Sequence, residues 1–304
     1  MAAASWPALR LDAWGDTYAA LHMGTQMVGK VALGLSPLTN HYWNTALQIT
    51  PRGLATLPLT VDRRIVTIAF DLVSHHLAIE CSDGGRTTVP LEPRPVAEFY
   101  RLVMEALARL NVRARIWTKP NEVSNPIRFE ADTVHRSYDP AAAQALLQVL
   151  VQIRRVLDPF RARFLGKSSP VHFWWGGFDL AHTRFSGRRA PVHPGGIPNL
   201  ADFVTREAYS HECISVGWWL GGGITPIEEP AFYAYAYPEP AGCPDAVIAP
   251  AGAAYDTRMH EWILPYEAVR RAPDPDAALL AFAQSTYEAA ANLGGWDRAS
   301  LERG

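Results

Sequence analysis

The stretch KSSPVHFWWGGFDLAHTRFSGR, residues 167–188, combines aromatic rings, two histidines, an aspartate and three cations within one short segment. Core strands are built mainly from Val and Ile, and surface strands alternate these with Thr, Lys or Glu. Neither kind of strand requires this mixture. The stretch therefore predicts a strand that is also the functional centre of the chain.

Alternation along a regular strand divides the side chains of this stretch between two faces. One face is predicted to carry His172, Trp174, Phe178, Leu180, His182 and Arg184. The other is predicted to carry Phe173, Trp175, Asp179, Thr183 and Phe185. The pair Gly176-Gly177 can form a bulge that changes this assignment, and bulges re-aim side chains near functional sites.

Part of the stretch has an echo near the start of the chain. The tripeptide His-Phe-Trp at 172–174 follows Ser-Pro, as does His-Tyr-Trp at 41–43, and a Gly-Lys pair precedes each, at 166–167 and at 29–30. The shared order of these features predicts a tandem duplication, and repeats are sought before other motifs for this reason.

Both halves show strand patterns and helix patterns in blocks, which favours an α+β fold with antiparallel sheets. Helical patterns are expected at 16–30, 95–110, 139–167 and 274–293, and strands at 41–61, 65–91 and 112–118. Tight turns are predicted at 51–53 and 82–85. The helix at 95–110 is predicted to be amphipathic, with Val96, Phe99, Val103, Leu107 and Leu110 on its apolar side, and Asp158-Pro159 could interrupt the helix at 139–167. The predicted fold is α+β, with two tandem related repeats, each an antiparallel sheet with packed helices. Residues 1–138 form the first predicted repeat, and residues 139–304 form the second, which carries the main site motifs. We expect the two to pack as one globular unit with a site in the crevice between them.

Composition limits the class of protein. The 304 residues are 48% hydrophobic and 19% charged, with a net charge of −2, which is typical of a soluble globular chain without a nucleic-acid-binding face. No apolar run approaches the roughly 18 residues of a membrane span, and the N-terminus does not resemble a secretory signal. Cys81, Cys213 and Cys243 are far apart and form no CxxC motif, which indicates free thiols in a reducing compartment. A cytoplasmic protein without nucleic-acid or membrane partners is expected.

Further motifs occur outside the opening stretch: AYSHE at 208–212, YAYPEP at 235–240 and WDR at 296–298. Together with the pattern GKxSPVHFxWGxFDLAxTRFSGR, they resemble a bacterial family of unknown function whose members are of about this length. The resemblance extends over nearly the whole chain, from Trp6 to Arg298. It implies one family along the chain and brings no activity or cofactor with it.

The Gly166-Lys167-Ser168 sequence does not form a phosphate-binding loop. Arg161 occupies the place of the upstream glycine, and the sequence follows a predicted helix instead of opening one. Lys30 and Lys167 are instead expected to complement the negative ends of the helices that precede them. No other motif identifies a cofactor.

Candidate catalytic residues are His172, His211, Glu212 and Asp179. Ser215 stands four residues after His211, so the pair His211-Glu212 is not part of an HExxH zinc motif. With His172 it could form a metal-binding set of two histidines and a carboxylate, or a general acid–base pair. The alternative is that the histidines are buried and hydrogen-bonded to the backbone.

Candidate ligand-binding residues are Arg184, Arg188, Trp174 and His41. The two arginines flank Ser186-Gly187, where guanidinium groups and backbone N–H groups could hold a carboxylate or phosphate. Pairing with protein carboxylates is the alternative. Tyr233, Tyr235 and Tyr237 alternate with alanines and line either a ligand wall or the core, whereas Glu261 has a strand-like context and is predicted to be structural.

Together these features predict an enzyme that acts on a small anionic or aromatic metabolite by His/carboxylate acid–base chemistry. The alternatives are a non-catalytic protein that binds a small molecule, and a structural or interaction protein in which the opening stretch is a core seam.

Overall fold

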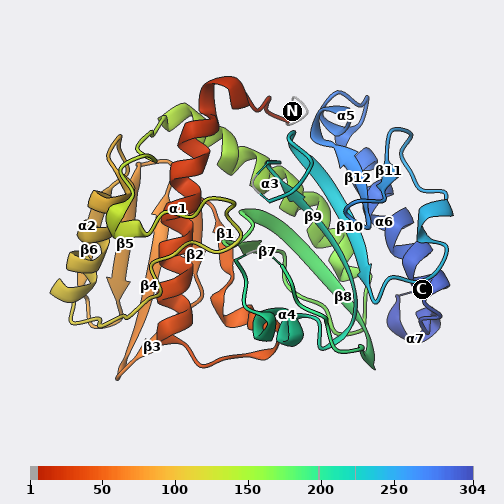
Figure 1. Ribbon diagram of the computed structural model, residues 1–304, viewed down its shortest axis with the longest axis horizontal. Helices are drawn as coiled ribbons and strands as arrows, with labels where there is room; N and C mark the ends of the chain where they lie inside the picture. The colour runs from red at the N-terminus through yellow and green to blue at the C-terminus, as the bar shows by residue number, and fades with distance from the viewer. Residues whose placement is uncertain (1–5, 198, 223, 304) are drawn as a thin grey trace. The chain divides into compact units, whose positions relative to one another are not determined.

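The computed structural model describes residues 6–197, 199–222 and 224–303 (Figure 1). The chain forms two compact units, each assembled from separate segments. Unit 1 comprises Met1–Ala8, Val149–His172 and Asp179–Gly304, and unit 2 comprises Leu9–Gln148 and Phe173–Phe178. Both units combine helices with an antiparallel sheet, which confirms the α+β class. The division into residues 1–138 and 139–304, and the duplication behind it, stay predictions.

Unit 2 contains the following elements: α1 (Leu11–Leu35), the 3-10 helix η1 (Asn40–Thr45), β1 (Leu47–Thr50), β2 (Gly53–Thr56), β3 (Leu59–Val61), β4 (Arg64–Asp71), β5 (His76–Cys81), β6 (Arg86–Pro90), α2 (Val96–Arg109), the 3-10 helix η2 (Phe129–Ala131), the start of α3 (Pro140–Ala162) and most of β7 (His172–Trp174). Its strands pair in the order β7-β1-β2-β4-β5-β6, with β3 beside β4. The pairing of Thr50 with Gly53 confirms the predicted turn at 51–53, and β5 and β6 flank the predicted turn at 82–85.

Helix α1 lies across one face of the unit 2 sheet (Figure 1). Gly24 of α1 faces Phe70 of β4 and Phe99 of α2, and a Cβ there would lie 3.4 and 3.5 Å from their rings, an ordinary van der Waals contact. The helix continues to Leu35, five residues beyond the predicted end at Lys30. Lys30 therefore does not complement a helix end; it is a buried side chain within the helix.

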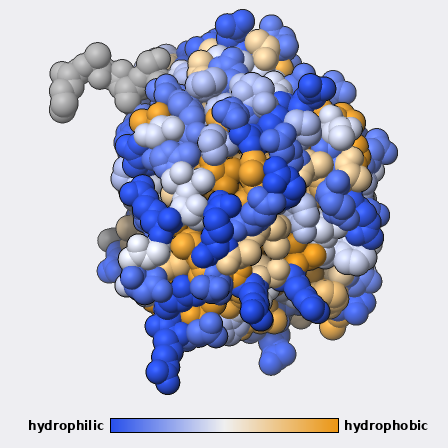
Figure 2. All heavy atoms as spheres, turned by 90° about the vertical axis from the view of Figure 1, so that its left-hand side faces the viewer, coloured by the Kyte–Doolittle hydropathy of each residue, from blue (hydrophilic) through white to orange (hydrophobic). Residues whose placement is uncertain are grey.

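Helix α2 has the predicted amphipathic pattern, with Val96, Phe99, Val103 and Leu107 buried. Its opposite side carries exposed charges. Figure 2 shows this side of the molecule, where hydrophilic side chains cover most of the surface and hydrophobic ones gather toward the middle.

Unit 1 contains most of α3, β8 (Asp179–Arg189), α4 (Asp202–Ala208), β9 (His211–Trp219), β10 (Ala231–Tyr237), the 3-10 helix η3 (Cys243–Asp245), β11 (Ala254–Asp256), β12 (Glu261–Pro265), α5 (Tyr266–Arg270), α6 (Pro275–Leu293) and α7 (Arg298–Leu301). Its strands pair antiparallel in the order β8-β9-β10-β12-β11.

The unit 1 sheet has one largely apolar face and one mixed face. Leu180, Trp218, Phe232 and Leu264 are paired across neighbouring strands, share one face and are buried. Helices α3 and α6 lie behind this face in the view of Figure 1. The register places aspartate, tyrosine, serine and glutamate side chains on the opposite face: Asp179, Ser215, Tyr233, Tyr235 and Glu261.

Several local predictions were wrong. Residues 112–118 form no strand, and the start of the predicted strand at 41–50 is the 3-10 helix η1, where His41 and Tyr42 have positive φ angles of 56° and 58°. Helix α3 passes through Pro159 without interruption. The opening stretch forms two strands, β7 and β8, separated by a turn at 175–178 that ends at Phe178 with a φ of 56°.

No helix in the described ranges is long and apolar enough to cross a membrane.

Candidate functional site

The mixed face of the unit 1 sheet is centred on Asp179, the first residue of β8. Tyr233 of β10 donates a hydrogen bond from its hydroxyl to Asp179 Oδ2 at 2.5 Å. Strand β9 lies between the two, and Gly217 leaves room for the tyrosine to pass over it. A Cβ on Gly217 would come within 2.4 Å of the phenol oxygen of Tyr233. The missing side chain at Gly217 is therefore what allows this contact across two strand spacings.

Burial raises the pKa of the Asp179 carboxyl to about 7, and the hydrogen bond from Tyr233 acts in the lowering direction without cancelling it. Removing a carboxylate from water disfavours its charged form, which is the general cause of such a shift. Near neutral pH the protonated and ionised forms of Asp179 are therefore both well populated.

Glu261, the first residue of β12, is a second carboxyl of this kind. Burial raises its pKa to about 8, and the negative charges of Asp179 and then Asp256 act in the same direction. Its Oε2 atom is inaccessible to solvent and has no hydrogen-bond partner. A buried polar atom without a partner costs roughly 1–3 kcal/mol, so a hydrogen-bond donor that reached this oxygen would be stabilising.

Aromatic side chains lie on the same face of the sheet as these carboxyls. The Trp219 ring lies with its centroid 4.6 Å from that of Tyr233, and Tyr233 and Tyr235 are stacked at 6.1 Å with 12° between their planes. The Nε1–H group of Trp219 is buried and also lacks a partner. Hereafter, Asp179, Trp219, Tyr233, Tyr235 and Glu261 are called the carboxyl–tyrosine cluster.

The cluster can exchange protons with a bound molecule. A general acid or base works best when its pKa lies near the working pH, and two carboxyls titrating near neutrality meet that condition. The aromatic rings can contact a flat or ring-shaped body. Among the described residues, no ion pair joins Asp179 or Glu261 to a cation.

Arg184 faces the opposite side of β8 and is only 2% exposed. Its guanidinium carbon lies 3.6 Å from the ring centroid of Phe160 and 4.2 Å from that of Tyr287. Its Nη2 donates to the Phe160 carbonyl at 2.5 Å. The structure thus places Arg184 in an aromatic sandwich beneath the helices, away from Asp179.

Arg188 and Glu212 lie together at the far end of β8. Arg188 Nε donates to Glu212 Oε2 at 2.7 Å, and its two other nitrogens donate to the carbonyls of Gly294 and Gly295 at 2.7 and 2.9 Å. Those carbonyls close helix α6, and cations commonly bind such helix ends. The Arg188 guanidinium is therefore engaged in holding α6 against β8.

The predicted histidines are not gathered around one ion. His172 is buried, and burial, with the charge of Arg161, lowers its pKa to about 4. His211 begins β9, and partial burial lowers its pKa as well. In the described part of the chain, no group of three or more His, Cys, Asp or Glu side chains is placed to hold a metal, so His172, His211 and Glu212 do not form one set.

The remaining predicted residues, Trp174 and His41, belong to unit 2. His41 is 4% exposed, and its ring centroid lies 5.4 Å from that of Trp43. Neither residue belongs to the carboxyl–tyrosine cluster.

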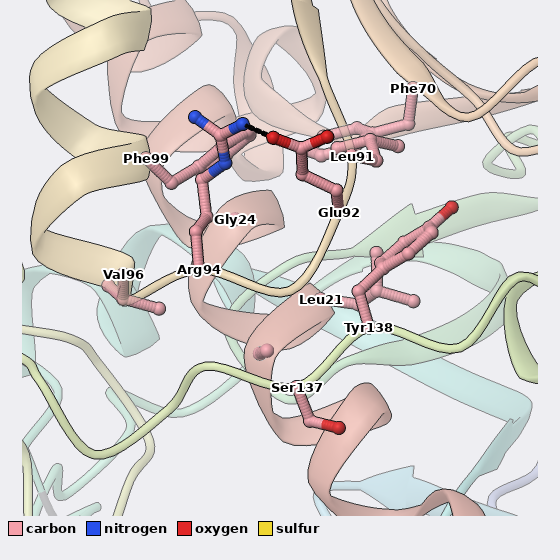
Figure 3. Close-up of a pocket in the computed structure, with 11 residues that line it drawn as sticks. Leu21, Gly24, Phe70, Leu91, Glu92, Arg94, Val96, Phe99, Ser137 and Tyr138 are labelled. Atoms are coloured by element: carbon pink, nitrogen blue, oxygen red, sulfur yellow. Dashed lines mark hydrogen bonds and ion pairs between the residues drawn. The ribbon is translucent and has the colours of Figure 1, made fainter.

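Unit 2 contains a small pocket between α1 and the start of α2 (Figure 3). Phe70, Phe99 and Tyr138 form part of its wall, and the ion pair of Glu92 with Arg94 lies beside it. Its cavity volume is about 40 Å³. A water needs roughly 10–15 Å³ measured in this way, so the pocket holds only a few waters and is too small for a metabolite.

Sequence reasoning found Asp179 and missed its partners. The alternation of tyrosine and alanine at 233–237 pointed to a tyrosine face, but nothing local linked that face to Asp179. Glu261 was interpreted as structural. Gly217 and Trp219 carried a usable signal, since a glycine beside aromatic residues in a strand often marks a close approach.

Comparison with known families gives one result. A model described as a family of unknown function (DUF5996) matches residues 6–303. No curated protein and no solved structure matches the chain.

Proposed function

The chain belongs to the family of unknown function DUF5996, and we propose from the carboxyl–tyrosine cluster that it is an enzyme performing acid–base chemistry on a small metabolite. Asp179 transfers the proton, and Tyr233 orients its carboxyl. Glu261 serves as a second proton-carrying group. Histidines contribute less than the sequence indicated, because burial keeps His172 neutral near pH 7.

One observation carries this proposal. Asp179 has a pKa of about 7 and is fixed by a hydrogen bond from Tyr233, while the nearby carboxyl of Glu261 has a pKa of about 8 and an unpartnered oxygen. Perturbed carboxyls of this kind gather at functional sites more often than elsewhere. The metabolite is aromatic or ring-shaped, since the rings of Trp219, Tyr233 and Tyr235 lie on the same face as the carboxyls.

The proposal is tested by screening metabolites for thermal stabilisation and following each hit for turnover by NMR. Asp179→Asn should lower turnover by about 100-fold or more, the usual effect of losing a general acid–base group. The rate should change with pH near 7 and 8. Asp245→Asn, an exposed carboxyl in the same unit, is the matched control. Full activity of Asp179→Asn would contradict the proposal.

A non-catalytic binding protein is the second candidate. It is favoured by the aromatic lining and by Cys213, whose pKa is raised to about 12 by burial, so that its thiol is not an activated nucleophile. In this case hits bind to wild-type protein and to Asp179→Asn without being converted by either. A purely structural protein would yield no specific hit.

We also propose a bacterial, cytoplasmic setting without nucleic-acid partners. The support is the sequence resemblance, the net charge of −2 and the three buried free thiols of Cys81, Cys213 and Cys243. Descent of the two chain halves from one duplicated segment stands as a proposal on the echoed motifs.

A further inference from the structure

The carboxyl–tyrosine cluster contains two buried carboxyl groups without a compensating cation. Asp179 accepts its hydrogen bond from a neutral phenol, and Glu261 has an unpartnered buried oxygen. The neighbouring Asp256 differs, because Arg258 Nη2 donates to its Oδ2 at 2.6 Å. Within the described residues, Asp179 and Glu261 are the carboxyls of this face that have no cation within 4 Å.

A second, independent feature points to a ligand. Trp219 is only 7% exposed, and its Nε1–H donor is buried without a partner on the same face as Asp179. Its ring stands beside Tyr233, which is stacked in turn on Tyr235. Buried donors and acceptors in proteins are nearly always satisfied, so the unpartnered donor of Trp219, on the same face of the sheet as the unpartnered oxygen of Glu261, is a group that a bound molecule would satisfy.

The combination of buried carboxyls and aromatic rings recognises cations. Aromatic faces attract ammonium groups through the ring quadrupole, and a desolvated carboxylate pairs with them strongly. An anionic ligand would instead meet two carboxyls and would leave the oxygen of Glu261 unpaired. The arginines that could have attracted an anion are bound elsewhere, Arg184 by Phe160 and Arg188 by Glu212.

We propose that the carboxyl–tyrosine cluster binds a small organic cation, a protonated amine with a ring-shaped body and a polar oxygen for Trp219. The ammonium group pairs with one of the two carboxylates, Asp179 or Glu261, and the ring contacts Tyr233 and Tyr235, whose strand β10 lies between β8 and β12. The organic cation is then the substrate class of the proposed enzyme. Turnover of the cation rests on the proposed function, whereas binding of the cation does not.

Binding of such a cation must expel protons. Burial raises the pKa of Asp179 to about 7 and that of Glu261 to about 8, so a substantial fraction of each carboxyl is protonated near neutral pH. An incoming ammonium group stabilises the ionised forms. The groups that face them are Tyr233, Tyr235 and Asp256, and the two phenols stay neutral because their pKa values are raised well above the ordinary range. Affinity therefore increases with pH as the carboxyl that pairs with the ammonium group ionises.

The experiment is calorimetric titration of the full chain with three matched probes: 2-phenylethylammonium, 2-phenylethanol and phenylacetate. We expect the cation to bind at least about tenfold tighter than the alcohol, and the anion to bind weakest. Titration in phosphate and in Tris, which differ in ionisation enthalpy, should reveal protons released on binding. Affinity for the cation should rise by about tenfold between pH 6 and 8.5.

Substitution of the two carboxyls tests whether the cation binds at the cluster. Asp179→Asn and Glu261→Gln should each weaken cation binding by about tenfold and reduce the proton release, whereas Asp245→Asn should change neither. If one variant does not fold, as judged by circular dichroism, the other carries the test. Binding of phenylacetate as tight as that of the cation would overturn the inference, as would absence of cation binding or unchanged affinity in both variants.

The two proposals can fail separately. Amines that bind to the cluster without any turnover would reject the enzyme and keep the cation site. Turnover of a neutral or anionic metabolite that depends on Asp179 would keep the enzyme and reject the cation site.

Discussion

At the scale of single residues, burial decides the chemistry of this protein. Asp179, Glu261, His172 and Lys30 have ordinary side chains, and desolvation is the largest cause of the pKa shift of each. Burial disfavours the charged form, so it raises the pKa of the acids and lowers that of the bases. These shifts make stability depend on pH in opposite directions.

The pKa of Asp179 is raised from its ordinary value of 3.8 to about 7, so the folded state binds more protons than the unfolded state between these pH values. The stabilisation is fully present below the unfolded pKa and is lost as pH rises through 7. Asp179→Asn keeps the shape of the protonated acid. We expect this variant to match wild type at pH 4 and to exceed it by about 2–4 kcal/mol at pH 8.

Urea denaturation at pH 4, 6 and 8 measures this difference. Asp245→Asn serves as the control and should parallel wild type at every pH. An equal pH dependence of wild type and Asp179→Asn would show that Asp179 ionises freely in the folded protein.

Arg184 offers a second prediction for a single residue. Its guanidinium fills the space between Phe160, Phe164 and Tyr287. Arg184→Ala should lower the free energy of unfolding by about 2–4 kcal/mol, since it leaves a cavity and removes the cation–π contacts. Arg184→Met keeps most of the volume and should cost less than about 1.5 kcal/mol.

Chemical denaturation of both variants gives these values, and probe binding to the methionine variant completes the test. Loss of ligand binding in a stably folded Arg184→Met would show that the arginine does anchor a ligand.

At the scale of elements, glycines fix how close two elements approach. On α1, Gly29 lies under the indole of Trp175, and a Cβ there would be 2.2 Å from the ring. The same indole donates to the carbonyl of Thr45 at 3.0 Å, and Lys30 lies over its face at 5.6 Å. The turn at 175–178 is thereby held against the helix.

Two alanine substitutions in the same helix should have opposite effects. Gly29→Ala must displace Trp175 and should destabilise unit 2 by about 1–3 kcal/mol, despite the better helix propensity of alanine. Gly15, which has nothing within 4 Å of its would-be Cβ, is the matched site. Gly15→Ala should stabilise the protein by up to about 1 kcal/mol.

Thermal melts of the two variants beside wild type decide this prediction. A Gly29→Ala protein as stable as Gly15→Ala would mean that Trp175 has another position available at little cost.

At the scale of the whole molecule, unit 1 incorporates residues from both ends of the chain. Trp6 donates from Nε1 to Asp276 at 3.1 Å, and Tyr266 donates to the carbonyl of Pro7 at 2.7 Å. Near the other end, Leu165 donates from its amide to the Leu301 carbonyl at 2.7 Å, and Tyr287 donates to Glu302 at 2.8 Å. Unit 1 is therefore complete only when most of the chain is present.

Deleting residues 298–304 should lower the free energy of unfolding by about 2–4 kcal/mol, because several hydrogen bonds worth about 1 kcal/mol each are lost beside Phe164 and Tyr287. Glu302→Gln keeps the backbone contacts and should have a smaller effect. Denaturant titration compares the two proteins. A deletion no more harmful than Glu302→Gln would show that the C-terminal segment contributes little to unit 1.

The sequence by itself determined the local parts of this protein. Turn residues at 51–53 and 82–85 predicted two hairpins, and the spacing of Val96, Phe99, Val103 and Leu107 predicted a helix with the correct buried side. These features depend on interactions between residues near one another in the chain, which a pattern records. The unusual composition of 167–188 also singled out Asp179.

Only the tertiary structure decided what Asp179 does. Its partner Tyr233 is 54 residues away and reaches it across β9 because Gly217 has no side chain. The pKa values of Asp179 and Glu261 depend on the loss of water that packing brings about, and no local sequence pattern encodes it. Arg184 was expected at a ligand and lies instead among aromatic rings. Strand register and burial are set by contacts between distant residues, so the site became visible only in the folded chain.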